Sequence, residues 1–76
     1  MTCPMGLCID HAGNILVTDR NRHCVNMFSN DGRFIKQLLN SKHNIKYPSG
    51  VAVGPGGQLA VTQLDPPSVK FYEFSL

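Results

Sequence analysis

The chain has 76 residues and a mass of 8.4 kDa, enough for one small domain or a piece of a larger one. Hydrophobic residues make up 42% of it, an ordinary globular share that excludes a disordered chain. The net charge of +2 names no class of partner by itself. Apolar runs such as residues 15–17 are too short to cross a bilayer, and we expect neither a signal peptide nor a transmembrane helix.

The first half of the chain is typical of four short strands. Residues that favour turns separate them: the Asp10–Asn14 segment, a polar connection at 20–23, and the Asn-Asp-Gly hairpin signal at 30–32. The last predicted strand also fits one turn of helix, because Phe34, Leu38 and Leu39 have a suitable spacing. The predicted strands are residues 6–10, 14–19, 24–29 and 33–39.

The second half predicts three more strands after a polar, basic connection. The connection covers residues 40–46, and a Gly-Pro-Gly-Gly turn at 54–57 separates the first two strands that follow. No stretch has the sustained apolar spacing of a capped helix. The predicted strands are residues 50–54, 58–63 and 68–74, so the sequence indicates an all-β protein.

An internal repeat is the strongest signal, because the chain matches itself when it is offset by 44 residues. Without a gap, six identities fall within 25 aligned positions, where chance gives about one or two. A period in the low forties is typical of four-stranded propeller blades. The identical pairs are Pro4/Pro48, Gly6/Gly50, Gly13/Gly57, Val17/Val61, Thr18/Thr62 and Val25/Val69.

The residues of the first unit resemble an NHL repeat. Residues 4–10 give a Pro-x-Gly opening and an apolar strand ending in Asp, and residues 13–19 give a Gly-Asn turn and another such strand. Residues 21–28 give an Asn-x-His-x-Val stretch and a terminal aromatic. The second unit departs from the pattern at 54–55 and at 63–68. The resemblance covers about residues 4 to 74.

NHL repeats form six-bladed β-propellers, most familiarly at the C-terminus of tripartite-motif ubiquitin ligases, where they bind proteins or RNA. The resemblance therefore implies two four-stranded-type blades of such a ring, the second lacking its outer strand, in a fragment of a larger propeller. The predicted units are an N-terminal tail (1–3), a first blade (4–39), an inter-blade connection (40–47) and an incomplete second blade (48–76).

Cations gather at one end of the predicted blades. In an up-and-down sheet, the connection after the second strand and the connection between blades lie at the same end. Clustered cations beside an aromatic ring suit single-stranded RNA or an acidic protein segment. His23 also fits a role in bracing its loop, and Asp19 fits a turn former. The predicted binding rim consists of Arg20, Arg22, His23, Lys42, His43, Lys46 and Tyr47.

Catalysis is not expected of this chain. It has no RING cysteine/histidine cluster, no phosphate loop and no nucleophile elbow, so we expect no cofactor or metal. A parent protein with a RING domain would be a ubiquitin ligase, with this segment choosing its target. Two alternatives stay open: a free-standing scaffold completed by oligomerisation, and the remnant of a metal-dependent propeller enzyme.

The three cysteines predict a reduced, cytoplasmic chain, because their number is odd and none forms a C-x-x-C pair. Cys8 and Cys24 fall on strands and are expected to be small core residues. The aromatic residues that end the repeat units, Phe28, Phe71 and Tyr72, are expected to pack between the blades.

Overall fold

A computed structural model of the chain describes residues 4–64 and 66–73. The predicted tail 1–3, Asp65 and the last residues of the second unit, 74–76, lie outside the described residues. The strands are β1 (Pro4–Ile9), β2 (Ile15–Asp19), β3 (Cys24–Phe28), β4 (Phe34–Leu39), β5 (Pro48–Val53), β6 (Gln58–Leu64) and β7 (Pro67–Glu73).

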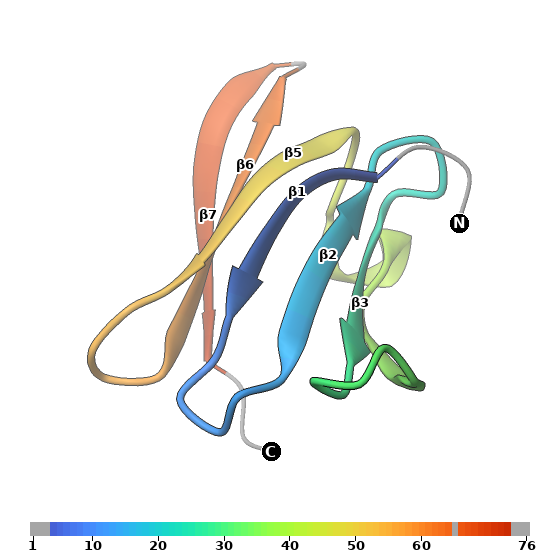
Figure 1. Ribbon diagram of the computed structural model, residues 1–76. Coiled ribbons are helices and arrows are strands. Elements are labelled where there is room, and N and C mark those ends of the chain that lie inside the picture. Colours follow the sequence, from blue (N-terminus) through green and yellow to red (C-terminus); the bar gives the residue numbers. More distant parts are fainter. Residues whose placement is uncertain (1–3, 65, 74–76) are drawn as a thin grey trace.

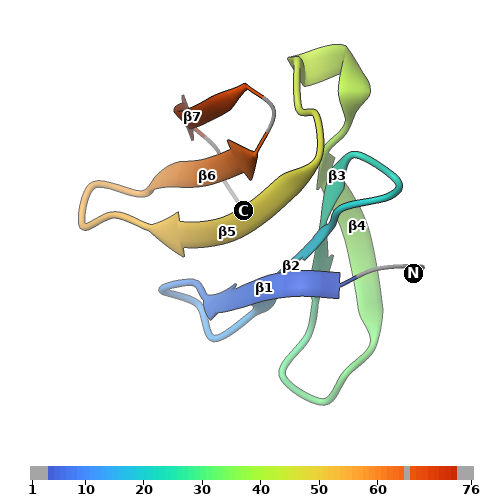
Figure 2. The same ribbon diagram turned by 90° about the horizontal axis from the view of Figure 1, so that it is seen from above.

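The strands form two antiparallel up-and-down sheets, in the orders β1-β2-β3-β4 and β5-β6-β7. The predicted all-β fold, with a second blade one strand short, is confirmed. The segment 33–39 is a strand and not a helical turn. Figures 1 and 2 show the innermost strands β1 and β5 running side by side in the same direction. No helix within the described ranges is long and apolar enough to span a membrane.

Glycine allows the tight turn between the first two strands of each sheet. Gly13 and Gly57 have φ of 88° and 85°, a left-handed conformation that other residues rarely adopt. In the first sheet the Asp10 carboxylate also accepts hydrogen bonds from the backbone N–H groups of Ala12 and Asn14, at 2.9 and 2.8 Å. The left-handed backbone at this position explains why glycine recurs at the repeat offset. The Asx-type bonds of Asp10 belong to the first sheet, because the matching residue of the second is Gly54.

The Pro-x-Gly openings have a structural cause as well. The pairing register of β1 with β2 shifts between Pro4 and Gly6, so the N–H of Gly6 loses its usual partner across the ladder. The Thr18 hydroxyl accepts that N–H at 3.0 Å. In the second sheet the Thr62 hydroxyl accepts the N–H of Gly50 at 2.7 Å. The recurring Gly and Thr therefore act as a pair. In each innermost strand the Thr hydroxyl accepts the Gly N–H that has no backbone partner at the register shift.

The same threonine joins the two sheets. Besides bonding to Gly6, the Thr18 hydroxyl donates a hydrogen bond to the backbone carbonyl of Ser49 on β5, at 2.8 Å. Gly6 leaves the space for this approach, because a Cβ atom at Gly6 would lie 2.5 Å from the carbonyl oxygen of Ser49. The repeat marked Thr18 only as a residue that recurs, whereas in the structure its hydroxyl links the two blades.

The hydrophobic core lies between the two sheets. Leu16, Val25, Leu59 and Val61 have no exposed surface, and both sheets contribute to the cluster. Burial of these side chains between the two sheets is the main source of stability for so small a chain, since buried apolar area drives folding. The buried members of the cluster are Leu16, Val25, Met27, Leu39, Ile45, Leu59 and Val61.

The expectation that all three terminal aromatics pack between the blades is wrong for Phe71 and for Phe28, because Phe28 lies opposite Ile15, on the face of the first sheet away from Leu16. Tyr72 packs against the core, and Phe28 is half-buried with its ring 5.8 Å from that of Phe34. Phe71 is 71% exposed. Side chains alternate along a strand, so Phe71 points away from the core that Tyr72 contacts. The ring of Phe71 therefore lies on the exposed face of β7.

Candidate functional site: a basic cleft at the blade boundary

The connection between the blades contains a short 3₁₀ helix, η1 (Ser41–His43), which the sequence did not predict. The Asn40 side chain accepts the N–H of Lys42 at 2.9 Å, and the N–H of Asn40 donates to the His43 ring at 3.2 Å. These reciprocal bonds form a capping box, which fixes the start of the turn. Asn44 ends it in the left-handed conformation, with φ 63°.

Strand β7 and the core hold this connection in place. Ile45 is only 2% exposed and inserts into the hydrophobic cluster. The Lys70 ammonium donates to the Asn44 carbonyl at 2.7 Å, and the Tyr72 hydroxyl donates to the His43 carbonyl at 2.7 Å. Burial raises the pKa of the Tyr72 hydroxyl further above neutral pH, so this donor persists into more alkaline solution. The backbone at 43–45 is therefore a fixed surface.

His23 connects the β2–β3 loop to the same surface. The N–H of Tyr47 donates to Nδ1 of His23 at 2.9 Å, and the two rings meet edge to face with centroids 4.6 Å apart. Both residues have positive φ, 52° and 48°, so the contact holds two strained turns together. His23 therefore braces its loop, as the sequence suggested, and its ring also reaches the cleft described next.

A cleft of about 530 Å³ opens between the connection and the second sheet. Three predicted rim residues line it: His23, Lys46 and Tyr47. Arg20, Arg22, Lys42 and His43 are not among the lining residues, and the ring of His43 is engaged in the capping box. The other lining residues are Ser41, Asn44, Ile45, Gln63, Pro66, Ser68 and Lys70.

Lys70 is the cleft residue that sequence reasoning missed. It lies in the middle of β7, directly opposite Val61 of the core face. The alternation of side chains along the strand could have revealed it, because Lys70 falls on the same face as Tyr72, where apolar residues are expected. Its stem crosses the half-buried face, and its ammonium emerges at the connection beside Asn44.

The cleft presents hydrogen-bond donors with a net positive charge. Lys46 and Lys70 supply two ammonium groups, and Gln63, Ser41 and Ser68 supply neutral polar groups. Among the described lining residues none is acidic. A carboxylate-bearing segment would gain charge-assisted hydrogen bonds here.

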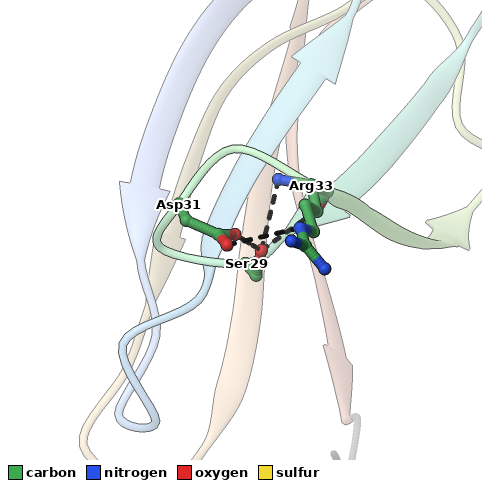
Figure 3. Close-up of polar contacts among 3 residues, drawn as sticks. All are labelled: Ser29, Asp31 and Arg33. Atoms are coloured by element: carbon green, nitrogen blue, oxygen red, sulfur yellow. Dashed lines mark hydrogen bonds and ion pairs between the residues drawn. The ribbon is translucent and has the colours of Figure 1, made fainter.

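The two ends of the molecule differ chemically. Figure 1 shows the β1–β2, β3–β4 and β5–β6 turns at the end opposite the β2–β3 loop. In the β3–β4 turn, Ser29 and Arg33 point toward the Asp31 carboxylate (Figure 3). The Ser29 hydroxyl donates to that carboxylate, and the Arg33 guanidinium lies 3.4 Å from it. The charges of this turn pair with each other, whereas the cleft offers cations.

The hydrogen bond from Ser29 lowers the pKa of the Asp31 carboxyl, and backbone hydrogen bonding adds to the effect. A lowered folded-state pKa favours the ionised carboxylate in the folded chain. The stabilising contribution is therefore present above the ordinary carboxyl pKa and is lost as pH falls through the lowered value. Protonation of Asp31 in acid therefore removes this contribution.

Asp19, Cys8 and Cys24 are buried or packed within the fold and make local structural contacts. The Asp19 carboxylate is fully buried and accepts the N–H of Arg22 at 3.3 Å, which confirms the predicted turn-forming role. Cys8 packs against the core and Cys24 is buried, and burial raises the pKa of both thiols. Within residues 4–64 and 66–73, no group of three metal-ligating side chains comes together.

Two small up-and-down sheets, packed face to face with their innermost strands side by side, are blades of a β-propeller. A solved structure of virginiamycin B lyase from Staphylococcus aureus, itself a propeller, superposes with a TM-score of 0.65 at 14% identity. The match covers 99% of this chain and 28% of that one. At this identity the likeness shows the fold alone.

Sequence comparison gives the kind of blade. Residues 1–28 match the NHL repeat family. The chain is 37% identical over 71 residues to NHL-repeat-containing protein 4 of Mus musculus, covering 93% of this chain and 50% of that protein. It is 30% identical over 74 residues to the mouse E3 ubiquitin-protein ligase TRIM32, covering 97% of this chain and 11% of that protein. The chain carries an NHL repeat, and the resemblance seen in its residues is confirmed.

The chain spans about half the length of the NHL-repeat-containing proteins that it matches, 50% of the mouse protein and 55% of the human one. It spans a much smaller share of the ligase. The similarity therefore supports a propeller module with NHL-type blades. The activity and partners of a whole protein are matters for proposal.

Proposed function

We propose that this chain is a recognition module, which binds an acidic segment of a partner protein in the cleft at the blade boundary. The observation that carries the proposal is the pair of lysines, Lys46 and Lys70, in a cleft whose described lining has no acidic residue. NHL repeats are generally binding modules and not catalysts, which is consistent with this role.

The fixed backbone of the connection supports the proposal. Because Ile45, Lys70 and Tyr72 hold residues 43–45 against the second sheet, the cleft wall needs little ordering when a ligand binds. Preorganisation of this kind raises affinity by lowering the entropy cost of association. Charged groups at the rim then steer an acidic partner toward the cleft.

RNA recognition has weaker support from the geometry. Base stacking needs open aromatic faces, but the ring of His43 packs at right angles to Tyr72, and Tyr47 is only 36% exposed beside His23. Arg20 and Arg22 are not among the residues that line the cleft. A single-stranded RNA remains the second candidate, and the same experiment tests it.

The proposal predicts that Lys46→Glu weakens binding of a glutamate-rich peptide by about tenfold, equivalent to about 1.4 kcal/mol. Fluorescence anisotropy with a dye-labelled polyglutamate peptide measures the affinity. Lys36→Glu is the matched control, since Lys36 is an exposed lysine of β4 that does not line the cleft. It should leave the affinity within about twofold of the parent.

A polyuridylate of similar length provides the second arm of that experiment. Tighter RNA binding with a steep salt dependence, reduced by Arg20→Ala with Arg22→Ala, would replace the acidic-protein proposal with the RNA one. If Lys46→Glu and Lys36→Glu lost the same affinity for the peptide, binding would depend only on net charge. That result would contradict the proposal that the cleft is the binding site.

We further propose that the complete protein is a tripartite-motif-type ubiquitin ligase located in the cytoplasm, in which this propeller segment selects the target. The support is the similarity to TRIM32 over 97% of the chain. An antibody against this segment should detect a polypeptide several times larger than 8.4 kDa, and its immunoprecipitate should transfer ubiquitin. A small polypeptide without transfer activity would contradict the ligase proposal, and it would not affect the proposal of recognition at the cleft.

A further inference from the structure

Each sheet has one face against the other sheet and one open face. Directly opposite residues of an antiparallel pair share a face, so the register assigns every side chain. In the first sheet, the covered face carries Leu16, Thr18, Val25 and Met27. In the second sheet, the covered face carries Val51, Val53, Leu59 and Val61.

The two open faces are both apolar. On the first sheet, Leu7 and Ile9 are 67% and 62% exposed, and they pair with Val17 and Ile15 of β2. On the second sheet, Val69 and Phe71 are 54% and 71% exposed. Phe71 pairs with Ala60, and Val69 pairs with Thr62. Large exposed apolar side chains gathered on a sheet face mark an interaction surface.

The repeat offset of 44 residues relates these faces to the contact inside the chain. It carries the covered face of the first sheet onto the open face of the second: Leu16, Thr18, Val25 and Met27 become Ala60, Thr62, Val69 and Phe71. It also carries the covered face of the second sheet back onto the open face of the first: Val51, Val53, Leu59 and Val61 become Leu7, Ile9, Ile15 and Val17. Each open face is therefore a repeat of one half of the internal interface.

We propose that a second copy of this 76-residue chain docks head to tail, with the open face of its first sheet against the open face of the second sheet of its neighbour. In a longer polypeptide, further blades of the same chain would take these places. The new contact repeats the internal one. Val69 and Phe71 then take the places of Val25 and Met27, and Leu7 and Val17 of the other copy take the places of Val51 and Val61.

Details of the two faces fit such a contact. Pro4, Met5, Gly6, Leu7 and Val17 line a hollow of about 230 Å³ on the first sheet, which gives an incoming apolar side chain a place to insert. On the second sheet, Thr62 is exposed and already accepts the N–H of Gly50, as Thr18 accepts that of Gly6. In the docked pair, its hydroxyl would donate to a backbone carbonyl of the next sheet, as the Thr18 hydroxyl donates to that of Ser49.

Because the two docking faces differ, the contact is heterologous, and this property can be tested. Leu7→Asp places a charge on the open face of the first sheet only, and Phe71→Asp places a charge on the open face of the second sheet only. Both sites are highly exposed, so the variants should fold, and far-UV circular dichroism checks that they do. His11→Asp, in the exposed β1–β2 turn, introduces the same residue outside both faces.

Sedimentation equilibrium should give the parent chain and His11→Asp masses above 8.4 kDa that rise with concentration. Each face variant alone should stay at the mass of one chain. An equimolar mixture of the two should form a one-to-one pair, since each still carries one intact face of the contact. A parent chain that remains a single chain at high concentration would overturn the proposal, as would assembly of either face variant alone or a mixture that does not pair.

Discussion

Leu16→Ala is expected to lower the free energy of unfolding by about 2–5 kcal/mol, the usual cost of a cavity in a sealed core. Leu16 has no exposed surface and belongs to the cluster that both sheets build. Small domains have a total stability of about 5–15 kcal/mol, so this one change removes a large fraction of it. Urea unfolding followed by circular dichroism measures the loss.

Leu64→Ala is the matched control for that experiment. Leu64 is a leucine at the end of β6 with 49% of its surface exposed, so its truncation leaves no sealed cavity. We expect a change within about 0.5 kcal/mol. If both variants lost the same stability, the boundary between the sheets could not be the main core of the chain.

Gly6→Ala is expected to cost about 3 kcal/mol, because it overpacks the closest approach of the two sheets. The added Cβ atom would lie 2.5 Å from the Ser49 carbonyl oxygen and 3.3 Å from the Gly50 Cα atom. Both are backbone atoms, so no side-chain rotation relieves the clash. Separation of β1 from β5 would also break the bond from the Thr18 hydroxyl to Ser49.

Urea unfolding measures the total cost of Gly6→Ala, and hydrogen exchange of the β1 and β5 amides shows where the loosening occurs. Gly56→Ala is the control, because a Cβ atom at Gly56 meets nothing closer than the Gln58 side chain at 3.7 Å, an ordinary contact. It should leave stability within about 1 kcal/mol of the parent. Comparable losses in the two variants would contradict the close approach of the sheets.

Much of the fold could be predicted from the sequence, because the strand patterns and the turn residues agree with each other. Asp10, Gly13 and Thr18 act through local bonds whose chemistry is visible in the chain, and the repeat offset shows that Gly13 and Thr18 recur. The end of the blades at which the cations gather follows from strand order alone. These features depend on neighbours in sequence or across one hairpin.

The features that escaped prediction depend on contacts between distant segments. η1 is held by the unusual pairing of Asn40 with the His43 ring, which the common Ser/Thr and Glu/Gln capping pattern does not include. Lys70 enters the cleft because β7 packs beside the connection, 26 residues earlier in the chain. Phe71 is exposed because no sheet formed by residues 4–64 and 66–73 faces the side of β7 that bears it, and strand periodicity cannot reveal this.

A titration of the isotope-labelled chain with a glutamate-rich peptide, followed through its amide chemical shifts, tests recognition at the cleft most directly. Saturable shifts are expected in the amides of residues 41–47 and 68–70, which border the cleft. The amides of Ser29, Asp31 and Arg33, at the other end of the first sheet, should stay unchanged. Shifts centred on that turn or on the open faces, or no saturable shift at all, would contradict the assignment of the cleft as the binding site.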